Sequence, residues 1–186
     1  SATRLTTATV LKQLTHDEEF IHVAFHPTEL LMAVGRNQLK YHSPLILLYR
    51  ISPDYSNTTL VSMTSMSSQD DFSRLVFSSD GKFIASEQDA TTNVWRRVAG
   101  ENESLWSVSL RMNAKSTWRK TPNPTSIAFN PRDPLLMHVG CIDGTLLVEQ
   151  MVHSAPKPPD RIGLHASAVT SLAFSPSGDV LLSGSV

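Results

Sequence analysis

The stretch of sequence that decides the fold is Thr170-Ser171-Leu172-Ala173-Phe174-Ser175-Pro176-Ser177-Gly178, because its pattern occurs three times earlier in the chain. The related segments are residues 21–27, 73–81 and 125–131. Four matched segments at regular spacing indicate an internal structural repeat. The steps between their phenylalanines are 52, 52 and 45 residues, and the phenylalanines are Phe25, Phe77, Phe129 and Phe174.

Each repeated segment is predicted to be a short β-strand that is buried on both faces. Side chains alternate along a strand, so the residue two before each phenylalanine shares its face. These residues are Val23, Leu75, Ile127 and Leu172. The residue directly before each phenylalanine lies on the opposite face and is small and apolar, namely Ala24, Val76, Ala128 and Ala173. A strand that is apolar on both faces is typical of the interior of stacked sheets.

A turn rich in Pro, Asp, Ser and Gly follows each phenylalanine, and further apolar strands follow the turn. Second strands are predicted at residues 30–34, 83–86, 135–139 and 180–183, and third strands at 45–50, 92–96 and 145–150. Fourth strands are predicted at 59–65, 105–111 and 146–152. No long segment has apolar residues at helical spacing, so we expect an all-β fold of four-stranded antiparallel sheets.

The fourth repeat, from His165 to Ser185, resembles the WD-repeat β-propellers. That family has a histidine before the first strand, and His165 and His16 each lie nine residues before their phenylalanine. The family also has an aspartate before the third strand and a tryptophan six residues later, which Asp89 and Trp95 match. Asp143 matches the aspartate in the third repeat. The resemblance implies structural roles for these five residues.

The other repeats depart from the family pattern. Ser68 and Lys120 occupy the histidine position in the second and third repeats. Tyr49 and Glu149 occupy the tryptophan position in the first and third. No repeat therefore has the complete His–Ser–Trp–Asp hydrogen-bond network of the family.

The resemblance implies a propeller portion of three blades and half of a fourth. The expected limits are residues 16–66, 67–118 and 119–163 for the three blades, and 164–186 for the start of the fourth. Residues 3–11 alternate in polarity and are predicted to form an outer strand that closes the last blade. Propellers have about 4–8 blades, so further chain or a partner protein is expected to supply the remainder. An open arc exposes sheet faces and strand edges.

Composition and motifs exclude several classes of protein. The chain has 186 residues, a formal charge of −1 and 40% apolar residues, which excludes a globally basic nucleic-acid binder and a disordered chain. The longest apolar run, residues 45–49, is too short to cross a bilayer, so we expect no membrane insertion. The single cysteine, Cys141, excludes an internal disulfide framework and fits a reducing compartment. The family resemblance implies an intracellular protein of the cytoplasm or nucleus.

The sequence carries no recognisable catalytic or cofactor motif. It has no Gly-x-Ser-x-Gly elbow, no phosphate-binding glycine loop and no Cys-x-x-Cys pair. His22 and His26 lie four apart, but they fall on a strand and a turn, where that spacing does not align metal ligands. Cys141 ends a predicted strand and is expected to be a buried small apolar residue. We therefore expect no enzymatic activity, no cofactor and no metal.

Candidate partner-binding residues fall into two groups. Glu19, Asp71 and Asn123 each lie six residues before a phenylalanine, where the family binds partners near its channel. Residues 96–120 hold six basic and two acidic residues, and their candidates are Arg111, Lys115, Trp118, Arg119 and Lys120. This second group suits an acidic protein surface or RNA. The alternative for the same residues is a solvated connecting loop with Trp118 packed back on the blade.

The predicted function is a non-catalytic scaffold for protein–protein interactions, a subunit of a larger intracellular assembly with other proteins as partners. The first alternative is an RNA- or nucleoprotein-associated propeller that uses the basic segment 96–120. An enzyme with a site at the propeller channel is the second alternative, and it would need convergent His, Asp or Glu side chains.

Overall fold

The computed structural model describes residues 20–36, 45–65, 72–88, 91–97, 106–113, 122–151 and 160–186. These residues form fourteen strands and no helix, so the predicted all-β class is confirmed. The first sheet has the order β1 (Phe20–Phe25), β2 (Leu31–Arg36), β3 (Leu45–Ile51) and β4 (Thr58–Ser65). The second sheet follows with β5 (Phe72–Phe77), β6 (Phe83–Gln88), β7 (Thr91–Arg97) and β8 (Trp106–Asn113).

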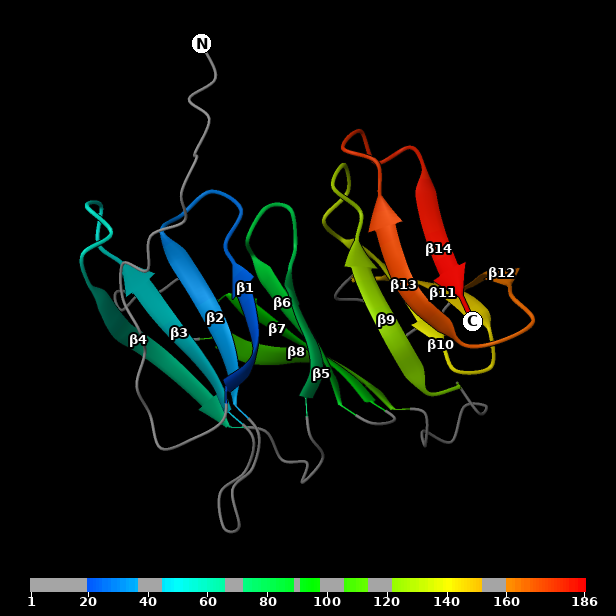
Figure 1. The fold of residues 1–186 in the computed structure, drawn as a ribbon, viewed down its shortest axis with the longest axis horizontal. Coiled ribbons are helices and arrows are strands. Elements are labelled where there is room, and N and C mark those ends of the chain that lie inside the picture. Colours follow the sequence, from blue (N-terminus) through cyan, green and yellow to red (C-terminus); the bar gives the residue numbers. More distant parts are fainter. Residues whose placement is uncertain are drawn as a thin grey trace.

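The third sheet contains β9 (Pro124–Phe129), β10 (Leu136–Cys141), β11 (Thr145–Gln150) and β12 (Asp160–Leu164). A two-stranded hairpin follows, made of β13 (Val169–Phe174) and β14 (Leu181–Ser185). All neighbouring strands within each sheet are antiparallel. Figure 1 shows the sheets following one another, with β1–β4 at one end of the molecule and the hairpin at the other.

The four phenylalanines occupy equivalent positions, as the repeat predicts. Each is the last residue of the first strand of its sheet, and each is paired with the second strand in the same register. The pairs are Phe25 with Met32, Phe77 with Ile84, Phe129 with Met137 and Phe174 with Leu181. The repeat is therefore one structural unit that recurs along the chain.

The predicted fourth strand of the third repeat was wrong. Residues 146–152 do not form it, because Thr145–Gln150 is the third strand, β11, and the fourth is β12 at Asp160–Leu164. β12 is short and mostly exposed, and Gly163 lies in its middle. The alternation of apolar and polar residues that marks a strand is therefore weak there. The predicted outer strand at 3–11 lies outside the described residues.

Neighbouring sheets pack through two unlike faces. We call the face with the phenylalanine the phenylalanine face, and the face with the residue before it the small-residue face. Ala33, Ile46 and Leu48, on the small-residue face of the first sheet, pack on Leu75, Ile84 and Trp95, on the phenylalanine face of the second. The small-residue face of the third sheet contributes Leu146, which packs with Val169 and Leu172 of the hairpin.

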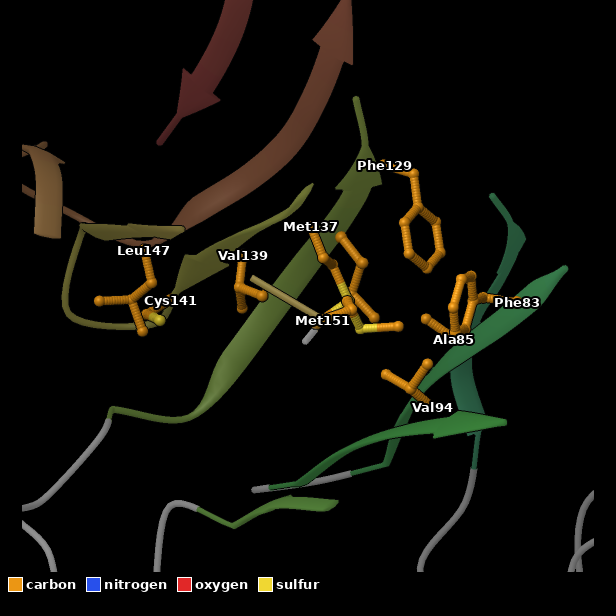
Figure 2. Packing of buried hydrophobic residues seen from close by; sticks show 10 residues of the cluster. Phe83, Ala85, Val94, Phe129, Met137, Val139, Cys141, Leu147 and Met151 are labelled. Atoms are coloured by element: carbon orange, nitrogen blue, oxygen red, sulfur yellow. The ribbon is translucent and has the colours of Figure 1, made fainter. Parts of the chain in front are cut away.

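The largest apolar core lies between the second and third sheets, and there too a small-residue face packs on a phenylalanine face. Phe83, Ala85 and Val94 present the small-residue face of the second sheet. Figure 2 shows these three side chains opposite Phe129, Met137 and Met151 of the third. Small residues on one side let the large residues of the other approach closely, and the buried apolar area stabilises the stack.

At each end of the stack, one face has no neighbouring sheet among the described residues. Phe25 is 66% exposed, whereas its equivalent Phe129 is 8% exposed. The prediction that every first strand is buried on both faces is therefore wrong for β1, which exposes Val23 and Phe25. It is also wrong for β13, which exposes Ala173. Both strands belong to a terminal sheet, which has a neighbouring sheet on one side alone among the described residues.

Met137→Ala tests the packing of the core. Met137 is fully buried between the second and third sheets, so its truncation leaves a cavity and is expected to lower the free energy of unfolding by about 2–5 kcal/mol. Ile142→Ala is the control, because Ile142 is exposed in a turn, and it should change that free energy by less than about 0.5 kcal/mol. Denaturant unfolding of both variants measures the difference, and equal effects would contradict the described packing.

Candidate partner-binding surfaces

The connections between strands gather at two opposite ends of the sheets. The turns after the four phenylalanines, residues 26–30, 78–82, 130–135 and 175–180, lie at one end, which we call the turn end. The turn at residues 142–144 and the connection at 165–168 lie at the other, which we call the loop end. Segments of this kind on a rigid sheet stack are where binding residues usually occur.

One candidate partner-binding residue, Asn123, has a described position at the loop end. It is half-buried just before β9, and its backbone carbonyl accepts a hydrogen bond from the amide of Ile142 at 2.8 Å. Arg111 lies in β8, three residues from its end. The remaining candidates lie outside the described residues, and they are Glu19, Asp71, Lys115, Trp118, Arg119 and Lys120.

In the sequence, the candidates lie directly before or after described strands. Glu19 directly precedes β1, Asp71 directly precedes β5, and residues 114–121 follow directly on β8. Each of these strands has the adjoining terminus at the loop end. The described strands that adjoin both predicted groups in the sequence therefore begin or end at the loop end, where Asn123 is found.

At the loop end, His165 links the third sheet to the hairpin, and Asp143 stabilises the adjoining turn. His165 shares a hydrogen bond with the Ser183 hydroxyl, at 2.7 Å between Nε2 and Oγ, and its amide donates to the Gly144 carbonyl at 2.8 Å. The Asp143 carboxylate accepts from the amide of Thr145 and holds the turn. Gly144 has a φ of +85°, and a Cβ there would lie 2.2 Å from the His165 carbonyl oxygen, so the turn requires glycine.

Trp95 is buried between the first and second sheets. Its Nε1 and the nearby Ser86 hydroxyl are both buried, and neither has a hydrogen-bond partner among the residues with described side chains. His16 and Asp89, the other two residues with an implied structural role, lie outside the described residues. Among the described residues, packing between the first and second sheets holds Trp95 in place.

The turn end carries polar links between neighbouring sheets that sequence reasoning missed. Arg97 of the second sheet forms an ion pair with Glu29 of the first, and its guanidinium lowers the pKa of Glu29. The Asn130 amide donates to the carbonyl of Gly178 at 3.2 Å, and Arg132 pairs with Asp179. These contacts join the first turn to the second sheet and the third turn to the turn of the hairpin.

His26 belongs to the same set of links. Its Nδ1 accepts hydrogen bonds from the amides of Thr28 and Glu29, and its ring lies edge-on to Phe77 of the second sheet at 5.2 Å between centroids. A Cβ on Gly81 would lie 1.9 Å from Nε2 of His26, so the imidazole rests directly on that glycine. The sequence contains a signal for these turns, namely a polar residue directly after each phenylalanine. In the structure each of these residues accepts a hydrogen bond within its turn, and they are His26, Ser78, Asn130 and Ser175.

Within residues 20–186, excluding the gaps given above, no three His, Cys, Asp or Glu side chains come together in a way that suits a metal ion. The same residues contain no helix that is long and apolar enough to span a bilayer.

The fold and the loop end together define a class of protein. Successive antiparallel sheets, stacked face to face with their connections at two ends, form the architecture of a β-propeller. The sequence profile of the WD domain, G-beta repeat, matches residues 157–186. The predicted resemblance to the WD-repeat propellers is thereby confirmed, and residues 157–186 contain a WD repeat.

Solved structures share this fold. Sqt1 from Chaetomium thermophilum superimposes with a TM-score of 0.68 and 20% identity, over 90% of this chain and 42% of that one. Sqt1 from Saccharomyces cerevisiae gives 0.62 and 13%, over 86% of this chain and 39% of that one. The computationally designed Ika4 protein gives 0.63 and 16%, over 97% of this chain and 93% of that one. The chain thus spans about two fifths of the length of the two Sqt1 chains, and no curated protein matches it.

The pH dependence of stability tests the buried setting of His138. His138 is 9% exposed on the small-residue face of the third sheet, edge-on to Phe174 at 4.8 Å, and burial lowers its pKa. The unfolded chain then binds a proton near pH 6.5, where the folded chain does not, so stability should fall as the pH drops below that value. Denaturant unfolding between pH 8 and pH 5 should show a smaller fall for His138→Leu, and parallel curves would contradict this assignment.

Thiol labelling tests the setting of Cys141. The thiol is fully buried, and burial together with the Asp143 carboxylate raises its pKa to about 12. Because the thiolate is the reactive form, Cys141 should resist a disulfide reagent at pH 8 in the folded protein and react fully once denaturant unfolds the chain. Rapid labelling of the folded protein would contradict the described burial.

Proposed function

We propose that the chain is a non-catalytic scaffold that binds other proteins within a larger intracellular assembly of the cytoplasm or nucleus. The observation that carries this proposal is the stack of antiparallel sheets, which gathers the connecting segments at two ends of a rigid body. Such a scaffold with variable loops is a usual basis for protein recognition. The WD repeat at residues 157–186 supports the same function.

The finer architecture is part of the proposal. We assign three blades to residues 16–66, 67–118 and 119–163, the start of a fourth to 164–186, and a closing outer strand to 3–11. The two end faces that have no neighbouring sheet among the described residues support an incomplete ring. On this assignment, further chain or a partner protein supplies the remaining blades.

We place the partner-binding surface at the loop end. Its proposed residues are Glu19, Asp71, Asn123, Arg111, Lys115, Trp118, Arg119 and Lys120. Binding energy at protein interfaces concentrates in a few aromatic and arginine side chains. Trp118 and Arg119 are therefore the proposed anchors, and the acidic and amide residues before the first strands contribute specificity.

Affinity purification with a variant pair tests this proposal. The tagged chain is compared with Trp118→Ala/Arg119→Ala, and bound proteins are quantified by mass spectrometry. The double variant should lose at least about tenfold of one reproducible set of proteins, because each anchor contributes roughly 1–2 kcal/mol or more. Lys82→Ala is the matched control, since Lys82 is an exposed cation at the turn end and should leave that set unchanged.

Nuclease treatment separates the scaffold from the RNA-binding alternative. Proteins that bind the loop end directly should survive treatment of the extract with ribonuclease. If the set disappears with ribonuclease, or if both variants behave like the unaltered chain, the proposed scaffold surface is wrong.

A further inference from the structure

The turn between β3 and β4 contains a backbone conformation that is unusual for the residue that adopts it. Tyr55 has a φ of +59° and is the one described residue other than glycine with a positive φ. In this left-handed region the Cβ of an L-residue crowds the following carbonyl oxygen, which costs free energy. Glycine has no Cβ and adopts the same conformation without that cost.

Three other described turns have the same backbone hydrogen bond and place glycine at the equivalent position. In each of the four turns the amide of the fourth residue donates to the carbonyl of the first, at 2.8–3.1 Å. The fourth residues are Gly81, Gly144, Gly178 and Tyr55, with φ values of +71°, +85°, +75° and +59°. Tyrosine therefore occupies a position at which this turn favours glycine.

Hydrogen bonds within the β3–β4 turn hold Tyr55 in this conformation. The Asp54 carboxylate accepts from the hydroxyls of Ser52 and Ser56, at 2.6 and 2.7 Å, and from the amide of Ser56 at 3.1 Å. The Ser52 hydroxyl accepts from the amide of Asn57 at 2.9 Å, and the Ser52 amide donates to the Asn57 carbonyl at 2.9 Å. The turn as a whole thus stabilises the strained residue.

The side chain of Tyr55 projects from the molecule and adds little to its core. It is 52% exposed and belongs to none of the four apolar clusters. At the three glycine turns, by contrast, a Cβ would lie 1.9–2.6 Å from a neighbouring group. Figure 1 shows the β3–β4 turn at the turn end, with the turns that follow the phenylalanines. A strained residue that contributes little burial indicates a role other than folding.

The tip of this turn combines an aromatic ring with a negative charge. Asp54 directly precedes Tyr55 and is exposed, and its hydrogen bonds with Ser52 and Ser56 lower its pKa to about 2, so it is ionised at neutral pH. The face of a tyrosine ring attracts a cation. A guanidinium stacks on such a ring and donates to a carboxylate with its planar N–H groups, which an ammonium does less well. The tip therefore suits arginine in particular.

We propose that the β3–β4 turn is a second partner-binding surface, at which Tyr55 and Asp54 bind an arginine in an exposed segment of another protein. The hydrogen bonds of the turn fix the ring before the partner arrives, which lowers the entropic cost of binding. This surface lies at the turn end, opposite the loop-end surface proposed above. The inference rests on the proposed scaffold function in one respect, which is that the partner is a protein.

Replacement of Tyr55 by glycine tests whether the side chain serves folding. Tyr55→Gly removes the backbone strain, which offsets the greater entropy of glycine in the unfolded chain, so the midpoint of denaturant unfolding should stay the same or rise. Tyr55→Phe keeps the ring and the strain, and its midpoint should match that of the unaltered chain. A lower midpoint for Tyr55→Gly would mean that the side chain supports the fold, and the proposal would be wrong.

A phage library of random short peptides tests the binding role. Peptides selected on the full chain are synthesised, and their dissociation constants are measured with the chain and its variants. Tyr55→Gly should raise the dissociation constant of one set of peptides by at least about tenfold, as expected for an aromatic anchor, and Tyr55→Phe should leave it nearly unchanged. Each peptide of this set should contain an arginine whose replacement by glutamine abolishes binding, and added salt should weaken the binding.

Trp118→Ala/Arg119→Ala is the matched control, because it alters the loop-end candidates and leaves the β3–β4 turn intact. This variant should bind the same peptides as the unaltered chain, and their loss would place the contact elsewhere and overturn the proposal. It would also fail if no peptide distinguished the chain from Tyr55→Gly, or if the distinguishing peptides lacked arginine. Since the proposed loop-end surface is tested by proteins lost from Trp118→Ala/Arg119→Ala, either surface can fail without the other.

Discussion

The structure depends on one constraint: each sheet is apolar on both faces, and the two faces differ in shape. A sheet of this kind cannot leave either face in water without losing the apolar burial that stabilises it. Ala33 and Ala85 are fully buried at the centres of two small-residue faces, where the large side chains of the next sheet reach the backbone closely. Because unlike faces pair, the sheets stack in one direction along the chain.

The two ends of the stacked sheets carry different contacts. At the turn end, a polar side chain after each phenylalanine closes its own turn, and contacts such as Glu29–Arg97 and Asn130–Gly178 reach the next sheet. Those contacts set the position of one sheet relative to its neighbour. At the loop end, the His165–Ser183 bond and the Asp143 turn hold the last repeat in place.

The repeat, the strand order and the buried setting of Cys141 and His138 could all be predicted from local sequence, because alternation and turn residues are short-range signals. β12 could not, since Asp160-Arg161-Ile162-Gly163-Leu164 lacks clear alternation and is defined by pairing with β11. The exposure of Phe25 was also missed. Its local sequence matches that of buried Phe129, and the difference comes from what lies beside the sheet. For the candidate binding residues, chain order predicts only that they adjoin strand termini at the same end of the sheets.

The contrast between Phe25 and Phe129 has a wider meaning for a repeat protein. Each unit of a repeat protein packs on its neighbours through equivalent positions, so the first sheet carries the packing residues of the inner sheets although no described sheet lies beside its phenylalanine face. The phenylalanine face of the first sheet retains eight apolar residues, although four of them are largely exposed in the isolated chain. A surface that served as a solvated cap would carry polar residues at those four positions. The retained apolar character therefore fits the packing positions of an inner repeat unit and not those of a solvated cap.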